Sequence, residues 1–238
     1  MMKKNGFTLA EVLITLAIIG VIATLTLPAL MTNTAEQQAK TALKKGINTL
    51  TEAAQMNQAI AGFDYASLTV PSTNDQDSQS LYGLLSQRAS VDFAKSKLAK
   101  DIQLSKGTTY GSYQGNGIAG TDNFAVFFRD GSSLMFPPDL ISSTSTAGKS
   151  GTERQNDGLP YGVTAIYDTN GTKGPNILSN CSTTGAAGVT TDVEQKDGET
   201  LDEVCTKTTR VIKDQFGVRL RGGYVVPNGA AARWAFEN

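Results

Sequence analysis

Residues 1–30 read MMKKNGFTLAEVLITLAIIGVIATLTLPAL, and this stretch decides the fold of the chain. Two lysines, Lys3 and Lys4, precede an apolar run over residues 7–30. A helix of this length can cross the hydrocarbon core of a bilayer, which is about 30 Å thick. The run is too long for the apolar region of a secretory signal peptide, and no small-residue cleavage site follows it directly. The stretch therefore predicts a membrane-spanning helix.

Glu11 is the exception inside this apolar run. A charge in a lipid-facing helix costs about 2–3 kcal/mol even on the mild insertion scales, so it normally has a partner or a role. One interpretation is that the carboxylate snorkels to the nearby membrane interface. The other is that a cation pairs with it.

The stretch KKNGFTLAEVLITLAIIGVIA resembles the class III signal of the type IV pilin and pseudopilin family. The resemblance implies that a prepilin peptidase cuts between Gly6 and Phe7 on the cytoplasmic side and methylates the new amine of Phe7. Glu11 then becomes the fifth residue of the mature chain (11 − 6 = 5), where the family carries its glutamate. Gly20 and Pro28 stand where family members often have a glycine and a helix-kinking proline. Glu11, Gly20 and Pro28 are accordingly the expected assembly residues.

A new α-amine on Phe7 gives Glu11 a partner of opposite charge. The two groups lie about one helical turn apart on the same face. Pairing lowers the cost of both charges in the bilayer, and in a bundle of subunits Glu11 can meet the amine of a neighbour instead. Pairing between subunits is the favoured interpretation, and snorkelling remains the alternative.

Helical periodicity continues beyond the apolar run, from Ala35 to about Ala61, and Gly62 is a plausible stop. The apolar residues of this second half fall near one stripe: Leu43, Ile47, Leu50, Ala54 and Ile60. We therefore expect one long helix over residues 7–61, apolar all round in its first half and amphipathic in its second.

The rest of the chain predicts a mixture of short elements. A second helical pattern covers residues 81–102, and a β-hairpin is expected around Arg129-Asp130-Gly131. Further strands are expected up to Tyr167 and over residues 224–226, with a looped C-terminal part. This order predicts a pilin-like α+β fold, in which a long N-terminal helix packs on an antiparallel sheet. The expected parts are a leader (1–6), a transmembrane and assembly helix (7–30), its amphipathic continuation (31–62) and a globular pilin-like domain (63–238).

Two further features point to sites in the globular part. Cys181 and Cys205 form an even pair, and the extracytoplasmic location that the resemblance implies favours a disulfide around a C-terminal loop over two buried free thiols. Asp168 and Asn170 lie in a DTNG stretch of the kind that holds calcium, and some major pseudopilins bind calcium in a late loop. The stretch lacks the glutamate and spacing of an EF-hand, and an ordinary turn is the favoured interpretation.

Composition argues against catalysis. The chain of 238 residues contains no histidine, which removes the commonest general base and metal ligand. Its formal net charge is −1, so binding of nucleic acid is not indicated. It also lacks a P-loop, a G-x-S-x-G motif and a CxxC motif. No catalytic site is predicted, and the expected role is structural.

The resemblance implies a subunit of a type IV pilus or of a type II secretion pseudopilus. Such a subunit sits in the inner membrane, in contact with lipid, with its C-terminal domain outside the cytoplasm, and then joins a helical filament at the cell surface or in the periplasm. The implied partners are other pilin or pseudopilin subunits, a prepilin peptidase, an inner-membrane platform protein and an assembly ATPase. The alternative is a membrane-anchored binding or adhesion module that does not polymerise.

Overall fold

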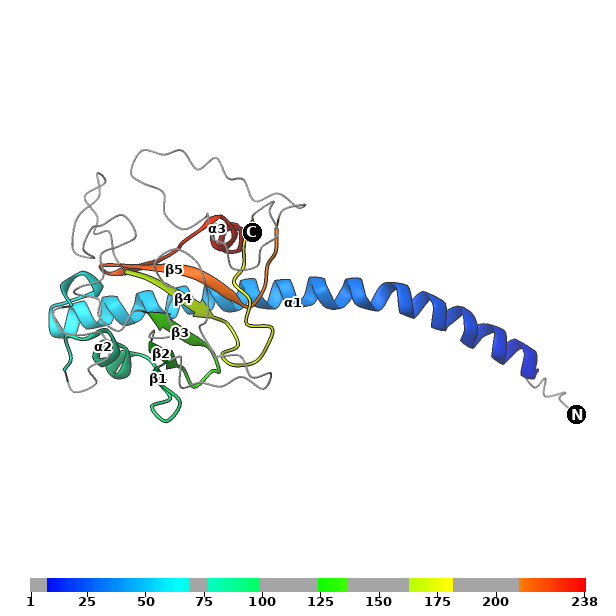
Figure 1. The fold of residues 1–238 in the computed structure, drawn as a ribbon, viewed down its shortest axis with the longest axis horizontal. Helices are drawn as coiled ribbons and strands as arrows, with labels where there is room; N and C mark the ends of the chain where they lie inside the picture. The colour runs from blue at the N-terminus through cyan, green and yellow to red at the C-terminus, as the bar shows by residue number, and fades with distance from the viewer. Residues whose placement is uncertain (1–7, 69–76, 99–123, 137–162, 182–209) are drawn as a thin grey trace, which may run out of the picture. The chain divides into compact units, whose positions relative to one another are not determined.

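The computed structural model describes residues 8–68, 77–98, 124–136, 163–181 and 210–238 (Figure 1). The chain divides into two compact units, Met1–Gln38 and Ala39–Asn238. Helix α1 (Leu9–Ala61) supplies residues to both units, as the continuous helical pattern predicted.

The first unit contains the apolar half of α1. Residues Leu9–Leu27 form a 19-residue stretch that is long and apolar enough to cross a membrane, and none of it is buried inside the protein. The helix is unbroken at residue 28, so Pro28 does not end it. This unit has the length and composition of a single-pass membrane anchor.

The second unit is built on a six-stranded antiparallel sheet whose spatial order is the sequence order. The strands are β1 (Lys97–Leu98), β2 (Phe124–Phe127), β3 (Ser133–Phe136), β4 (Val163–Asp168), β5 (Gln215–Arg221) and β6 (Tyr224–Pro227). Among the described residues, three short helices accompany them: η1 (Tyr65–Ser67), α2 (Leu81–Arg88) and α3 (Ala230–Glu237). Because each strand pairs with its neighbour in sequence, the sheet is a simple meander. The α+β prediction is confirmed.

The core lies between the second half of α1 and one face of the sheet. Leu43, Ile47, Leu50 and Ala54 are buried in one cluster with inward side chains of β2 to β6. Successive side chains of a strand point to opposite faces of the sheet. On the face away from α1, alternate side chains of β2 to β4 therefore form a second buried cluster with Leu178. Its members in the strands are Ala125, Phe127, Met135 and Ile166. The sheet is thus buried on both faces over these strands.

Ile60 was predicted on the buried stripe of α1, but it is 65% exposed. At 3.6 residues per turn it lies about 80° around the helix from Leu50, outside the stripe. The prediction was wrong because the spacing of ten residues does not return to the same face.

The second predicted helix is also shorter than expected. Helix α2 ends at Arg88, and Ala89 already has an extended backbone (φ −112°, ψ 158°). Val91, which is buried, then forms a β-bridge with Phe128 at the end of the hairpin. Pairing with the sheet therefore overrides the helical pattern after residue 88, and β1 occupies residues 97–98. Residues 99–102 of the prediction lie outside the described residues.

The hairpin and the strands ending near Tyr167 and covering 224–226 are confirmed as β2–β3, β4 and β6. The C-terminal part, predicted as mostly loop, instead contains β5 and α3. Strand β5 reads QFGVRLR, and its alternating Phe216, Val218 and Leu220 face the core. This alternation was a usable signal that the prediction overlooked.

Candidate functional site

Helix α1 begins with a capping box formed by Thr8 and Glu11. The backbone N–H and the hydroxyl of Thr8 donate to Glu11 Oε2 at 2.9 and 2.8 Å. In return, the Glu11 backbone N–H donates to Thr8 Oγ1 at 3.3 Å. Two backbone donors of the first turn are therefore satisfied by side chains.

The capping box gives Glu11 a partner inside its own chain that sequence reasoning missed. The signal was present, since Thr8 and Glu11 have the spacing of the S/T-x-x-E pattern. The capping box also holds the Glu11 carboxylate at the N-terminal end of the helix, where the helix dipole favours negative charge. Gly6 and Phe7 lie outside the described residues, so pairing of Glu11 with the Phe7 amine remains a prediction.

The other two predicted assembly residues lie further along α1. A methyl group on Gly20 would meet no atom of the described chain within 4 Å, so no described part of this chain requires glycine there. The backbone is helical at Pro28. Their roles in assembly remain predictions.

Cys181 is buried beside Ala230 and Ala231 of α3. Next to it, Asn180 and Val211 form a two-way backbone bridge, with N···O distances of 2.9 and 2.8 Å. The bridge joins the two flanks of the segment 182–209. Cys205 lies inside that segment, outside the described residues, so its pairing with Cys181 remains a prediction.

Asp168 and Asn170 lie together at the end of β4. The Asp168 side chain is fully buried, its Oδ2 accepts from Gln215 Nε2 at 2.5 Å, and its Oδ1 accepts from the Asn170 backbone N–H at 3.0 Å. A second buried carboxylate, Asp214, accepts from the backbone N–H groups of Asn176 and Ile177 at 2.7 and 2.9 Å. Sequence reasoning missed Asp214, because its partners lie 38 and 37 residues away along the chain.

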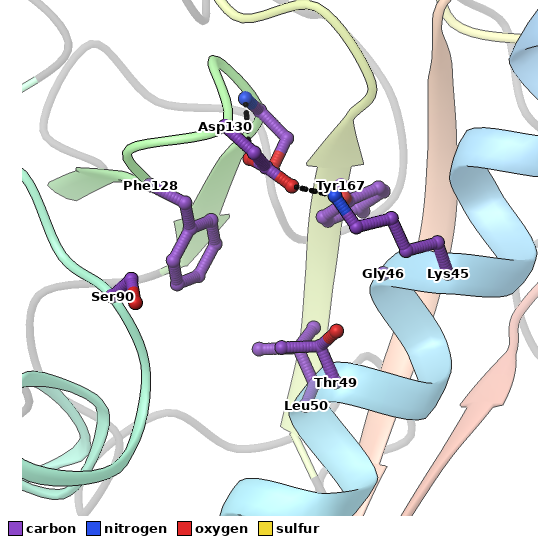
Figure 2. A pocket seen from close by; sticks show the side chains of 9 residues that line it. Lys45, Gly46, Thr49, Leu50, Ser90, Phe128, Asp130 and Tyr167 are labelled. Atoms are coloured by element: carbon purple, nitrogen blue, oxygen red, sulfur yellow. Dashed lines mark hydrogen bonds and ion pairs between the residues drawn. The ribbon is translucent and has the colours of Figure 1, made fainter.

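A pocket opens between α1 and the β2–β3 turn (Figure 2). Its floor includes Leu50, Phe128 and Tyr167, and at its rim Lys45 Nζ lies 2.8 Å from Asp130 Oδ2. Burial opposes ionisation of Asp130, but hydrogen bonds from Lys45 and Ser132 outweigh it and lower the pKa of its carboxyl group. Because both rim residues are more than a third exposed, the pair contributes at most about 1 kcal/mol.

Tyr167, in the floor of this pocket, is buried and lies against Gly46 of α1. Burial raises the pKa of its phenol to about 12. The pocket was not predicted, since Lys45 and Asp130 are 85 residues apart. Its polar groups serve mainly to join α1 to the sheet.

Comparison with known proteins bears on the N-terminal segment. Residues 1–27 match the family model of the prokaryotic N-terminal methylation motif. Together with the apolar helix Leu9–Leu27 and the antiparallel α+β architecture, this match supports a type IV pilin-like family for the chain, a family of structural proteins. No curated protein and no solved structure matched the chain.

Proposed function

We propose that this chain is a structural subunit, a pilin, minor pilin or pseudopilin, of a type IV pilus or a type II secretion pseudopilus. The observation that carries the proposal is the methylation motif at residues 1–27, joined without interruption to the apolar helix Leu9–Leu27. A secreted protein would discard such a segment, whereas a pilin-like subunit retains it as its membrane anchor and assembly helix.

In the proposed pathway, a prepilin peptidase removes residues 1–6 and methylates the amine of Phe7. The subunit waits in the inner membrane with its C-terminal unit outside the cytoplasm. A platform protein and an assembly ATPase then move it into the filament. Repetition of one heterologous contact, between two different surfaces of identical subunits, builds an open helical assembly.

Glu11 is proposed to set the register of this contact by pairing with the amine of a neighbouring subunit. Its capping box with Thr8 supports a precise position for the carboxylate, because two hydrogen bonds from Thr8 hold it at the first helical turn. Glu11 can accept from Thr8 and still receive a cation, since a carboxylate offers about four acceptor positions.

A disulfide between Cys181 and Cys205 is proposed for the extracytoplasmic unit. Cys181 is not a free thiol in the structure. The bridge between Asn180 and Val211 supports the pairing, because it holds together the two ends of the segment that contains Cys205.

N-terminal analysis of the native membrane protein by mass spectrometry tests the proposed processing. A mature chain that begins with N-methyl-Phe7 is expected, and a start at residue 1 or 2, or beyond residue 30, would refute it. Gly6→Val should leave uncut precursor in the membrane, because the resemblance implies a peptidase that admits only a very small side chain there. Gly20→Ala is the matched control and should be cut normally.

Assembly is tested separately from processing. Surface filaments are sheared from cells, imaged by electron microscopy and examined by mass spectrometry for this chain. A processed chain that is present in the filaments supports the proposal. A processed chain that stays in the membrane fraction, with none in filaments, would indicate an anchored binding module instead.

A further inference from the structure

Two exposed features of the second unit lie on opposite sides of α1. The pocket of Figure 2 is lined by Thr49 of α1. The β5–β6 hairpin instead approaches α1 at Thr51, whose hydroxyl accepts from the Val225 backbone N–H at 3.1 Å. Successive helical residues are about 100° apart, so residues 49 and 51 project about 200° apart around the helix. The pocket and the β5–β6 hairpin therefore belong to two different surfaces of one subunit.

The first feature, the pocket, has room for one aromatic ring. Its volume is about 200 Å³, and Phe128 lies across it from Leu50 and Tyr167 (Figure 2). An apolar cavity of about 150 Å³ can hold a benzene molecule. The pocket is therefore large enough for a single aromatic side chain.

Exposed apolar side chains extend the pocket along α1. Met56 is 50% exposed and Ile60 is 65% exposed. They follow Thr49 by seven and eleven residues, which places both within about 20° of it around the helix. Contiguous exposed apolar surface of this kind marks interaction sites. The pocket, Met56 and Ile60 together are called the pocket face below.

The second feature is the ring of Tyr224, which begins β6 and is 57% exposed. Its backbone is held by pairing with Arg221 of β5, and the residue after it donates to Thr51. Phe93 is equally exposed, but it lies three residues after Ser90, which lines the pocket, so it belongs to the same side as the pocket. In the described part of the chain, Tyr224 is thus the exposed aromatic ring on the side away from the pocket.

We propose that the Tyr224 ring of one subunit inserts into the pocket of a neighbouring copy of the chain, between Leu50 and Phe128. This contact deepens the proposed function and rests on it, because it requires filament assembly. A ring on one surface and a pocket on another make a heterologous contact, and its repetition gives an open helical assembly. Tyrosine side chains in desolvated pockets are common anchors of protein interfaces.

The rim of the pocket suits a phenol. Lys45 Nζ donates to Asp130 Oδ2 at 2.8 Å, and an ammonium group has three donors. Lys45 can therefore donate to Asp130 and to the oxygen of an inserted phenol at the same time. Met56 and Ile60 extend the apolar contact along α1 and exclude water from the side of the anchor.

Photocrosslinking in filaments tests the contact directly. The photoreactive residue p-azidophenylalanine takes the place of Tyr224, since it keeps an aromatic ring, and sheared filaments are irradiated and digested for mass spectrometry. Crosslinks are expected between residue 224 of one subunit and the peptides that contain Leu50 or Phe128 of another. The control carries the same photoreactive residue in place of Asn48, which is exposed on α1 about 100° from Thr49, and should give no crosslink to the Phe128 peptide.

Substitutions of exposed residues test the energetic role of the contact. Tyr224→Ala should lower incorporation into filaments about tenfold, as loss of an interface anchor does, whereas Tyr224→Phe should keep most of it. Thr49→Trp places an indole at the mouth of the pocket and should also lower incorporation, while Asn48→Trp should not. Processing and membrane level should match wild type in all four variants, because none of these side chains is buried.

The outcomes separate this contact from the proposed function. A wild-type chain that is absent from filaments refutes the proposed function, and the contact with it. Filaments that contain the wild-type chain, but show no crosslink from residue 224 to the pocket, refute the contact alone. Wild-type incorporation of both Tyr224→Ala and Thr49→Trp would do the same.

Discussion

Replacing Gly46 by alanine should destabilise the second unit, although alanine favours helices. Gly46 lies in α1 directly against the ring of Tyr167 in the pocket of Figure 2. A Cβ atom on Gly46 would lie 2.2 Å from Tyr167 Cζ and 2.5 Å from its hydroxyl oxygen. Unstrained carbon–carbon contacts are about 3.5–4.0 Å, so the ring would have to move by more than an ångström.

The residues around Tyr167 do not allow its ring to move aside without a cost in free energy. Its side chain is 2% exposed, and its strand, β4, is paired on one side with β3 and on the other with β5. Overpacking of a core costs about 1–3 kcal/mol, and an overlap of this size belongs at the upper end. The higher helix propensity of alanine offsets about 1 kcal/mol of this loss of stability. The net loss is about 2 kcal/mol, which lowers the Tm of a unit of this size by about 4–8 °C.

Thermal unfolding of the detergent-solubilised chain, followed by near-ultraviolet circular dichroism, measures this loss. Asn48→Ala is the matched control, because residue 48 is exposed on the same helix and should unfold at or slightly above the wild-type temperature. In the double variant Gly46→Ala/Tyr167→Leu, the coupling energy should offset part of the two single losses. A Gly46→Ala protein that unfolds at or above the wild-type temperature would refute the packing argument.

Three further predictions concern the N-terminus, the cysteines and the buried tyrosines. Glu11→Ala should insert in the membrane at wild-type levels but lose most of its incorporation into filaments, because a neighbour's amine is left unpaired. Quantitative immunoblotting of membrane and filament fractions measures both levels. Incorporation at the wild-type level would favour the snorkelling alternative. Non-reducing peptide mapping should find Cys181 joined to Cys205. On the chain-entropy argument, this bridge raises the free energy of unfolding by about 3.5 kcal/mol. Alkylation of both thiols without reductant would contradict the prediction. Burial raises the pKa of Tyr65 and raises that of Tyr167 to about 12, so the contribution of both to stability is complete below the unfolded pKa of about 10, and that of Tyr167 is lost as the pH rises through 12. Absorbance at 295 nm should show two of the seven phenols ionising only with unfolding, and ionisation of all seven near pH 10 in a folded chain would disprove it.

Most of the elements that depend on neighbouring residues were predicted correctly, whereas those that depend on contacts between distant residues were not. Helix α1 and the β2–β3 hairpin were predicted because their signals lie in contiguous residues. The second helix was predicted too long because Val91 pairs with Phe128, a contact that no local pattern reports. The capping box of Thr8 and Glu11 was not predicted, although its signal is local and consists of the S/T-x-x-E spacing of the two residues.

By itself, the sequence determined the N-terminal motif, the apolar helix and the α+β class, because each depends on the order of neighbouring residues. Only the tertiary structure decided which distant side chains meet. The pairing of β4 with β5 sets Gln215 opposite Asp168, 47 residues away, and places Asp214 under the backbone of Asn176. The DTNG stretch alone favoured an ordinary turn, and the contacts of this turn depend on that strand register, which is fixed by burial of both faces of the sheet.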